Sequence, residues 1–225
     1  MTAVSHPQLN LESYIANLFS DPQLLRMGHG QGKDDLNLGL GWIYYGLARA
    51  IRPKLAVVIG SYRGFVPSVI AKALLDNGDG GKVAFIDPSL VDDFWREPER
   101  VKAHFQQLGT PNIQHYLHTT QDFVQTPDYA EMAEIGLLMV DGLHTAEQAQ
   151  FDYECFLPKL SQDAVCLFHD SLRIRESKLY GVDKAYQHTV RSFMHTLEGR
   201  DDTDILTLPI AEGLSLVKRR PPASA

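Results

Sequence analysis

From residue 55 onward, short apolar runs alternate with longer amphipathic segments, and this alternation constrains the fold more than any other feature. The apolar runs predict strands, because buried parallel strands are nearly continuous in Val, Ile and Leu. These strands cover 55–60, 82–87, 113–117, 135–141 and 164–170, and the segments between them predict helices at 66–76, 94–109 and about 145–160. Such an order predicts an α/β fold, a doubly wound and mostly parallel sheet with helices on both faces.

The two ends of the chain depart from this pattern. Residues 182–199 have helical spacing, and the runs 204–210 and 214–219 flank a Gly-containing turn, which predicts an antiparallel hairpin. The first 50 residues predict helical additions at 12–19 and 36–51, joined by the polar, Gly-rich loop 27–35.

Composition excludes several function classes. The formal net charge of −7 argues against nucleic acid or an acidic membrane as a partner, because both require a basic surface. No apolar run approaches the ~20 residues that span a bilayer, and no signal peptide is recognised. The two cysteines, Cys155 and Cys166, do not suggest a disulfide framework. We therefore expect a cytoplasmic protein without a membrane or nucleic-acid partner.

Polar residues and glycines follow the predicted strands at their carboxyl ends. Parallel strands joined by right-handed crossovers end at the same edge of a sheet, and ligands bind at that edge. Gly60, Asp87, Asp141 and the pair His169–Asp170 occupy these positions. We expect them to face one shared crevice.

The first strand is followed by glycines at 60 and 64, and the second strand by an acid at 87. Glycines between a strand and a helix let the backbone approach a ligand, although they can also serve only a tight turn. Asp87 is placed to accept ribose hydroxyls, or to cap a turn. Together they indicate a nucleoside-bearing cofactor. Tyr62 in the middle position does not fit the G-x-G-x-x-G of nicotinamide enzymes.

The fourth and fifth strands contribute Asp141, His144, His169 and Asp170. Carboxylates and imidazole on one edge can hold a divalent cation, or can act without metal, with His144 as general base. Each residue alone could also be a structural cap. The histidines that lack a partner at a diagnostic spacing are interpreted as surface or core residues: His6, His104, His115, His118, His188 and His195.

A resemblance to class I S-adenosylmethionine-dependent methyltransferases rests on four stretches: VVIGSYRGF, FID, LLMVDGLHTAEQAQFDYECFLPKL and AVCLFHDS. It covers about residues 53–220 and is strongest to O-methyltransferases of the macrocin, cephalosporin-biosynthesis and catechol type. It implies a Rossmann-like, seven-stranded sheet with one antiparallel strand near the C-terminus. It also implies a methyltransferase domain over 53–220 and a helical extension over 1–52 that covers the active site.

The resemblance assigns roles to matching positions. Gly60, Ser61, Tyr62 and Gly64 would bind the methionine part of the cofactor, Asp87 the ribose, and Gln121 and Asp122 the adenine. Asp141 would also contact the cofactor. Asp141, His169 and Asp170 match the positions that hold a divalent metal such as Mg²⁺, and His144 and Asp141 would be catalytic. The methyl acceptor would be a hydroxyl of a small molecule.

Two positions depart from the family. Val58 stands where relatives usually carry an acid that helps to hold the methionine amine, and His169 stands where several metal-using relatives have a carboxylate. A nicotinamide-dependent oxidoreductase and a non-catalytic cofactor-binding relative therefore remain as alternatives. The aromatic segment GWIYYGLA suits a homo-oligomer interface as well as a core.

Overall fold

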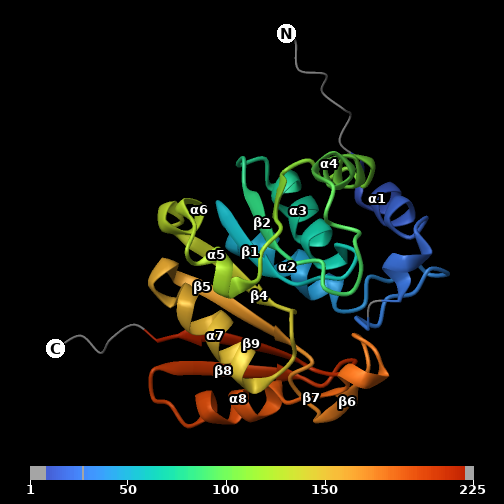
Figure 1. The fold of residues 1–225 in the computed structure, drawn as a ribbon. Coiled ribbons are helices and arrows are strands. Elements are labelled where there is room, and N and C mark those ends of the chain that lie inside the picture. Colours follow the sequence, from blue (N-terminus) through green and yellow to red (C-terminus); the bar gives the residue numbers. More distant parts are fainter. Residues whose placement is uncertain (1–8, 27, 221–225) are drawn as a thin grey trace.

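A computed structural model describes residues 9–26 and 28–220, and its centre is a single seven-stranded sheet (Figure 1). The strand order is β3-β2-β1-β4-β5-β9-β8. Strands β1 to β5 are parallel to one another, and β9 is antiparallel to both β5 and β8. The strands are β1 Leu55–Ile59, β2 Lys82–Ile86, β3 Ile113–Tyr116, β4 Ile135–Val140, β5 Leu160–His169, β8 Thr203–Leu208 and β9 Leu214–Arg219. The predicted fold class is confirmed.

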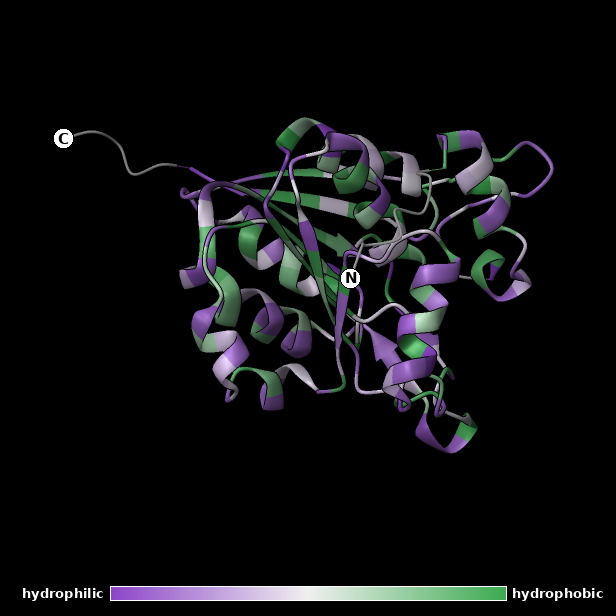
Figure 2. Cartoon of the chain, turned by 90° about the horizontal axis from the view of Figure 1, so that it is seen from above, coloured by the Kyte–Doolittle hydropathy of each residue, from purple (hydrophilic) through white to green (hydrophobic). Residues whose placement is uncertain are grey.

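Helices cover both faces of this sheet. The first face carries α1 Leu11–Leu18, α2 Gly41–Ile51, α3 Phe65–Asn77 and α4 Pro98–Gln107. The second carries α5 Thr120–Phe123, α6 Pro127–Glu131, α7 Ala146–Phe156 and α8 Val190–Glu198. Consecutive strand residues face opposite sides, so Val58 belongs to the first core and Val57 to the second. Figure 2 shows the hydrophobic strands enclosed between helices whose polar residues lie outward.

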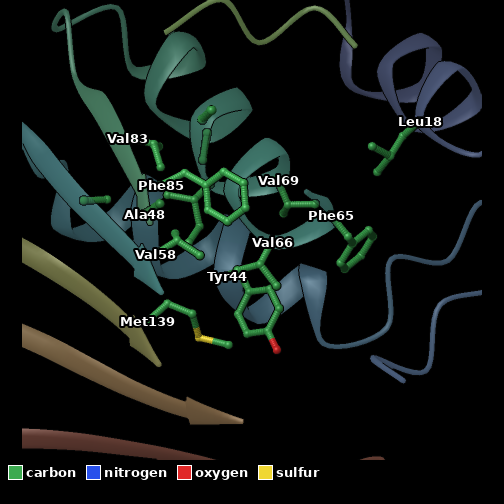
Figure 3. Close-up of a cluster of buried hydrophobic side chains, with 14 of the residues drawn as sticks. Leu18, Tyr44, Ala48, Val58, Phe65, Val66, Val69, Val83, Phe85 and Met139 are labelled. Atoms are coloured by element: carbon green, nitrogen blue, oxygen red, sulfur yellow. The ribbon is translucent and has the colours of Figure 1, made fainter. Parts of the chain in front are cut away.

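The N-terminal helices share the core of the main sheet. Tyr14 of α1 and Tyr44 of α2 are fully buried in the same cluster as Val58 and Phe85, and Figure 3 shows Tyr44 beside Val66. The predicted helix 36–51 begins only at Gly41, because Leu36 and Gly39 have φ values of +53° and +57°. The described part of the extension therefore packs with the sheet rather than apart from it.

The predicted helix 182–199 is wrong in its first half. Residues 186–188 form strand β7 (Tyr186–His188), which pairs antiparallel with β6 (Arg175–Ser177) in a separate two-stranded sheet. Long-range pairing overrides the local helical pattern here. Short 3-10 turns at Pro22–Leu25, Leu157–Lys159 and Val182–Lys184 complete the described elements. Among residues 9–26 and 28–220, no helix has the length and apolar character needed to cross a bilayer.

The strand order reverses between β1 and β4, and this point positions the site. β2 lies on one side of β1 and β4 on the other, so the connections leave β1 and β4 toward opposite faces. The Asp141 amide donates to the Ile59 carbonyl at 2.8 Å, and the Gly60 amide donates to the Ile86 carbonyl at 2.8 Å. These bonds bring the segments after β1, β2 and β4 to one edge, as ligand-binding α/β sheets require.

Candidate functional site

A pocket of about 690 Å³ opens at this edge. Nine of the predicted site residues line it: Gly60, Ser61, Tyr62, Asp87, Gln121, Asp141, His144, His169 and Asp170. Two predicted residues, Gly64 and Asp122, do not line it. The volume falls within the range of about 300–1,000 Å³ that is usual for ligand sites.

Gly60 is required by the close approach of two turns. Its φ is +72°, and a Cβ atom there would lie 2.4 Å from the Gly142 Cα and 2.6 Å from the Asp141 carbonyl oxygen. Gly64 has a different role: it precedes α3 with φ +82°, and a Cβ would meet the Phe105 ring at 2.9 Å. Gly60 therefore shapes the pocket, whereas Gly64 allows the Phe105 ring to pack against the start of α3.

Asp87 is held at the end of β2 by two backbone donors. The Ser89 amide donates to one carboxylate oxygen at 2.7 Å, and the Ser61 amide donates to the other at 3.3 Å. Burial raises the pKa of Asp87 to about 6, although both amides favour the ionised form. The carboxylate thus lies directly beside the Gly60 turn, where the cofactor prediction requires it.

A chain of hydrogen-bonded side chains from α5 and α7 lines the other end of the pocket. The Gln121 amide donates to Gln148 at 2.8 Å, and the Gln148 amide donates to Asp152 at 2.7 Å. Asp152 is fully buried, its pKa is raised to about 6 by burial, and its Oδ2 atom has no hydrogen-bond partner among the described residues. Asp122 accepts instead from Thr119 on the exposed side.

Sequence reasoning missed Gln148 and Asp152. Both belong to the stretch AEQAQFD, four residues apart on α7, and both contribute to the pocket lining. The spacing placed them on one helix face, but nothing in the sequence showed that this face meets the loop after β3.

The predicted acid–imidazole residues come together at the ends of β4 and β5. His169 Nδ1 lies 2.9 Å from Asp141 Oδ1 and 3.4 Å from Asp170 Oδ1. His144 Nε2 lies 3.9 Å from Asp141 Oδ1 and 3.8 Å from Asp170 Oδ2. Asp170 has φ +52°, a left-handed conformation that non-glycine residues adopt mainly at constrained sites.

Two further histidines complete the group, and neither was predicted. His29, from the loop before α2, has its Nε2 atom 3.6 Å from Asp141 Oδ2. His188, interpreted from the sequence as a surface or core residue, is buried in β7, and its Nδ1 atom lies 2.8 Å from Asp170 Oδ2. No spacing in the sequence links 29 or 188 to the strand ends, so only the folded chain identifies them. We call His29, Asp141, His144, His169, Asp170 and His188 the histidine cluster.

The other predicted surface or core histidines are distributed differently. His195 pairs with Glu198 on the surface of α8, and the His104 ring packs beside Trp95. His115 Nε2 lies 3.1 Å from the Asp87 carbonyl, while His118 contributes to the pocket wall. His6 lies outside the described residues.

Electrostatics divide the histidine cluster into neutral and charged groups. Burial lowers the pKa of His144 to about 3, even though Asp170 opposes this, so its imidazole is neutral at pH 7. Burial also disfavours protonation of His169, but the Asp141 carboxylate outweighs it and raises the pKa of His169. Burial would raise the pKa of Asp170, but the bond to His188 and the nearby His169 hold it below its usual value. Asp170 is therefore ionised.

The donor set fits a divalent metal. Two groups of three side chains have ligand atoms within 4.8 Å of one another: His29, Asp141 and His169, and His144, His169 and Asp170. Both nitrogens of His169 and the Oδ1 atom of Asp170 are buried without a well-formed hydrogen bond among the described residues. Buried polar atoms normally have partners, and since His169 Nδ1 already faces Asp141 Oδ1 at 2.9 Å, the Nε2 atom of His169 is the nitrogen left to a ligand.

Comparison with known proteins shows which family the chain belongs to. A family model described as a methyltransferase domain matches residues 57–171, which is just over half of the chain. The chain belongs to this methyltransferase family. The match ends after the fifth strand and contains Gly60, Asp87, Asp141 and Asp170. The predicted resemblance to class I methyltransferases is confirmed.

Solved structures share the fold at low identity. A methyltransferase from Geobacter sulfurreducens matches with a TM-score of 0.63 and 17% identity over 96% of this chain and 93% of its own. The O-methyltransferase TomG from Streptomyces achromogenes, in complex with S-adenosylmethionine, gives 0.61 and 17% over 93% and 96%. An O-methyltransferase from Bacillus cereus, in complex with S-adenosylhomocysteine, gives 0.64 and 11% over 95% and 94%.

One curated relative is more similar in sequence. The uncharacterized protein y4gI of Sinorhizobium fredii is 31% identical over 145 residues. The match covers 60% of this chain but only 15% of that protein, so the chain corresponds to a small part of this relative.

Val58, the departure from the family pattern, lies away from the pocket. Its side chain is fully buried in the first core, where Figure 3 shows it near Val66 and Met139. A carboxylate at this position would be enclosed by hydrocarbon on the α2 and α3 side of the sheet. The pocket is reached instead by its neighbour Ile59.

Proposed function

We propose that the protein transfers a methyl group from S-adenosylmethionine to a hydroxyl of a small molecule, with a divalent cation assisting. One observation carries the proposal: the nucleoside-type pocket and the histidine cluster are continuous at the β1–β4 switch point, and Asp141 belongs to both. Family membership supports methyl transfer. TomG and the Bacillus cereus enzyme supply the analogy for the cofactor and for oxygen as the acceptor.

The pocket residues have complementary roles toward this cofactor. The Asp87 carboxylate would accept hydrogen bonds from the ribose hydroxyls. The unpartnered Oδ2 atom of Asp152, with Gln121, would receive the adenine amino group. The Gly60 turn would let the backbone approach the methionine part, because nothing larger than hydrogen fits there. Bound S-adenosylmethionine supplies an electrophilic methyl group.

The acceptor would enter beside the histidine cluster. The Nε2 atom of His144 lies 3.9 Å from Asp141 and 3.8 Å from Asp170, so it would take the proton of the hydroxyl while these carboxylates stabilise the imidazolium that forms. Asp141 and His169 would hold the cation beside Asp170, and a bound divalent cation lowers the pKa of a hydroxyl and fixes its orientation. The His29 loop and Arg175 border this part of the pocket and would enclose the acceptor. Leu143 and Leu179, 38% and 49% exposed, provide an apolar rim.

Cofactor binding is tested by isothermal titration with S-adenosylmethionine, S-adenosylhomocysteine and NADH. We expect both adenosyl compounds to bind and NADH not to bind. The Asp87→Ala variant should lose more than about 10-fold in S-adenosylhomocysteine affinity, because charged hydrogen bonds contribute about 1.5–3 kcal/mol. Asp122→Ala is the matched control, since Asp122 lies outside the pocket, and its affinity should be unchanged. Binding of NADH alone would refute the proposal.

Transfer is tested with S-adenosylmethionine labelled in the methyl group and a panel of phenols, catechols and sugars. The label should appear on oxygen of at least one acceptor. The His144→Gln variant should lower the rate by about 100-fold or more, because general-base catalysis contributes at least that factor. Its S-adenosylhomocysteine affinity should be unchanged. Tight cofactor binding without transfer to any acceptor would favour the non-catalytic alternative.

A further inference from the structure

The histidine cluster is richer in nitrogen donors than a Mg²⁺ site needs. It holds four imidazoles and two carboxylates, contributed by the loop before α2, the turn after β4, the end of β5, and β7. Only the middle part lies within the family match at 57–171, whereas His29 and His188 lie outside it. The composition is therefore a property of this chain rather than of the matched domain alone.

The group of His29, Asp141 and His169 is better suited to a cation than the group around Asp170. The Arg175 guanidinium donates to Asp170 at 2.7 Å, and His188 contacts the same carboxylate oxygen at 2.8 Å. A guanidinium at this distance repels a divalent ion. Asp141 has no Lys or Arg partner in the described part of the chain, and its ion-pair contacts are to histidines.

The three donors are oriented toward one another. The Nδ1 atom of His29 lies 3.1 Å from the Tyr44 hydroxyl, and its ring stacks on Phe65 with the centroids 5.2 Å apart. This leaves Nε2 facing Asp141, which is the orientation that outer partners impose on metal-binding histidines. The side chains of His29 and His169 are 1% and 5% exposed, and both His169 nitrogens lack a well-formed hydrogen bond among the described residues.

The chemistry of these imidazole and carboxylate ligands indicates which metal ion the site prefers. Imidazole suits Zn²⁺, Co²⁺, Fe²⁺ and Ni²⁺, whereas Mg²⁺ prefers oxygen and retains several waters. We propose that His29, Asp141 and His169 form a site that binds a first-row transition metal of the Zn²⁺ or Co²⁺ type in preference to Mg²⁺. His144, Asp170 and His188 surround it. Metal binding requires neither cofactor nor acceptor. The proposal therefore rests on the proposed function only where the metal is given a role in methyl transfer.

Metal binding at this site would also anchor the N-terminal segment. The Leu40 amide donates to the His29 carbonyl at 2.8 Å, and a Cβ at Gly39 would lie 2.2 Å from that carbonyl oxygen. The loop between residues 28 and 40 is therefore closely packed around His29. Ligation of His29 would connect this loop to the end of β4, so the metal should slow amide exchange in residues 28–40.

The test uses protein freed of metal with EDTA, after removal of the chelator, and contains no S-adenosyl compound. Titrations with Zn²⁺, Co²⁺ and Mg²⁺ should show one site that binds Zn²⁺ and Co²⁺ at least about 100-fold more tightly than Mg²⁺. Bound Co²⁺ should give visible ligand-field bands, and X-ray absorption of the Zn²⁺ form should report two imidazole ligands. Hydrogen exchange should slow in residues 28–40.

The variants His29→Gln and His169→Gln should each weaken Zn²⁺ binding by more than about 10-fold. His195→Gln is the control, because His195 is an exposed histidine on α8 paired with Glu198, and it should bind Zn²⁺ normally. Equal Zn²⁺ and Mg²⁺ affinity, absence of binding, or loss of binding in His195→Gln would overturn the proposal. If a variant fails to fold, the Co²⁺ absorption bands and the Zn²⁺ X-ray absorption spectrum of the wild-type protein still test the proposal. Metal binding without methyl transfer would refute only the proposed function.

Discussion

The buried carboxyl of Asp87, the proposed ribose-binding residue, should destabilise the folded protein at neutral pH. Burial raises its pKa from 3.8 to about 6. The folded state therefore binds this proton more tightly than the unfolded state, and the free energy of unfolding should fall as pH rises from 4 to 6. The full difference between those pKa values corresponds to about 3 kcal/mol above pH 6.

The Asp87→Asn variant removes the free-energy cost of ionising a buried carboxyl and introduces the smaller cost of one lost hydrogen bond. Its side-chain oxygen can still accept from the Ser89 amide, which lies 2.7 Å from one Asp87 oxygen. Its NH₂ group would face the Ser61 amide, which now donates at 3.3 Å, and losing that bond costs about 1 kcal/mol. We therefore expect the variant to be about 2 kcal/mol more stable than the wild type at pH 7.5.

Urea unfolding of the cofactor-free protein between pH 4.5 and 8 measures this effect. The difference between the variant and the wild type should be small or reversed at pH 4.5 and should grow to its full value above pH 6. Asp122→Asn serves as the control, since this carboxyl is exposed and should follow the wild type. If the wild-type and Asp87→Asn curves run parallel over the whole pH range, the assignment of a raised pKa to Asp87 is refuted.

Two further predictions concern the packing at Gly60 and the accessibility of the two thiols. Gly60→Ala should cost more than about 2 kcal/mol in urea unfolding, because its Cβ would lie 2.4 Å from the Gly142 backbone at φ +72°. Gly46→Ala on α2, where the space is open, should instead stabilise by about 0.5–1 kcal/mol; equal effects would contradict the packing argument. Burial raises the pKa of both Cys155 and Cys166 to about 12, so a thiol reagent at pH 8 should label neither until urea unfolds the chain. Rapid labelling of the native protein would show that the thiols are accessible.

The local pattern of apolar residues was sufficient to predict the central strands of the sheet. The apolar runs that form β1, β2 and β4 are buried on both faces, so their hydrophobicity is continuous and their lengths follow from it. The local pattern did not predict the structure of residues 182–188. Their helical spacing is local, whereas β7 forms because Arg175–Ser177 offers a partner strand.

The sequence by itself determined which residues stand at the ligand edge. Gly60, Asp87, Asp141 and His169 directly follow or end buried strands, and parallel strands end on one side of a sheet. Only the tertiary structure decided what surrounds them. His29 and His188 reach the same carboxylates from a loop and a short strand far away in the chain, and no local interaction encodes that meeting. The donor set of the cluster, on which the proposed metal preference rests, therefore depends on long-range packing.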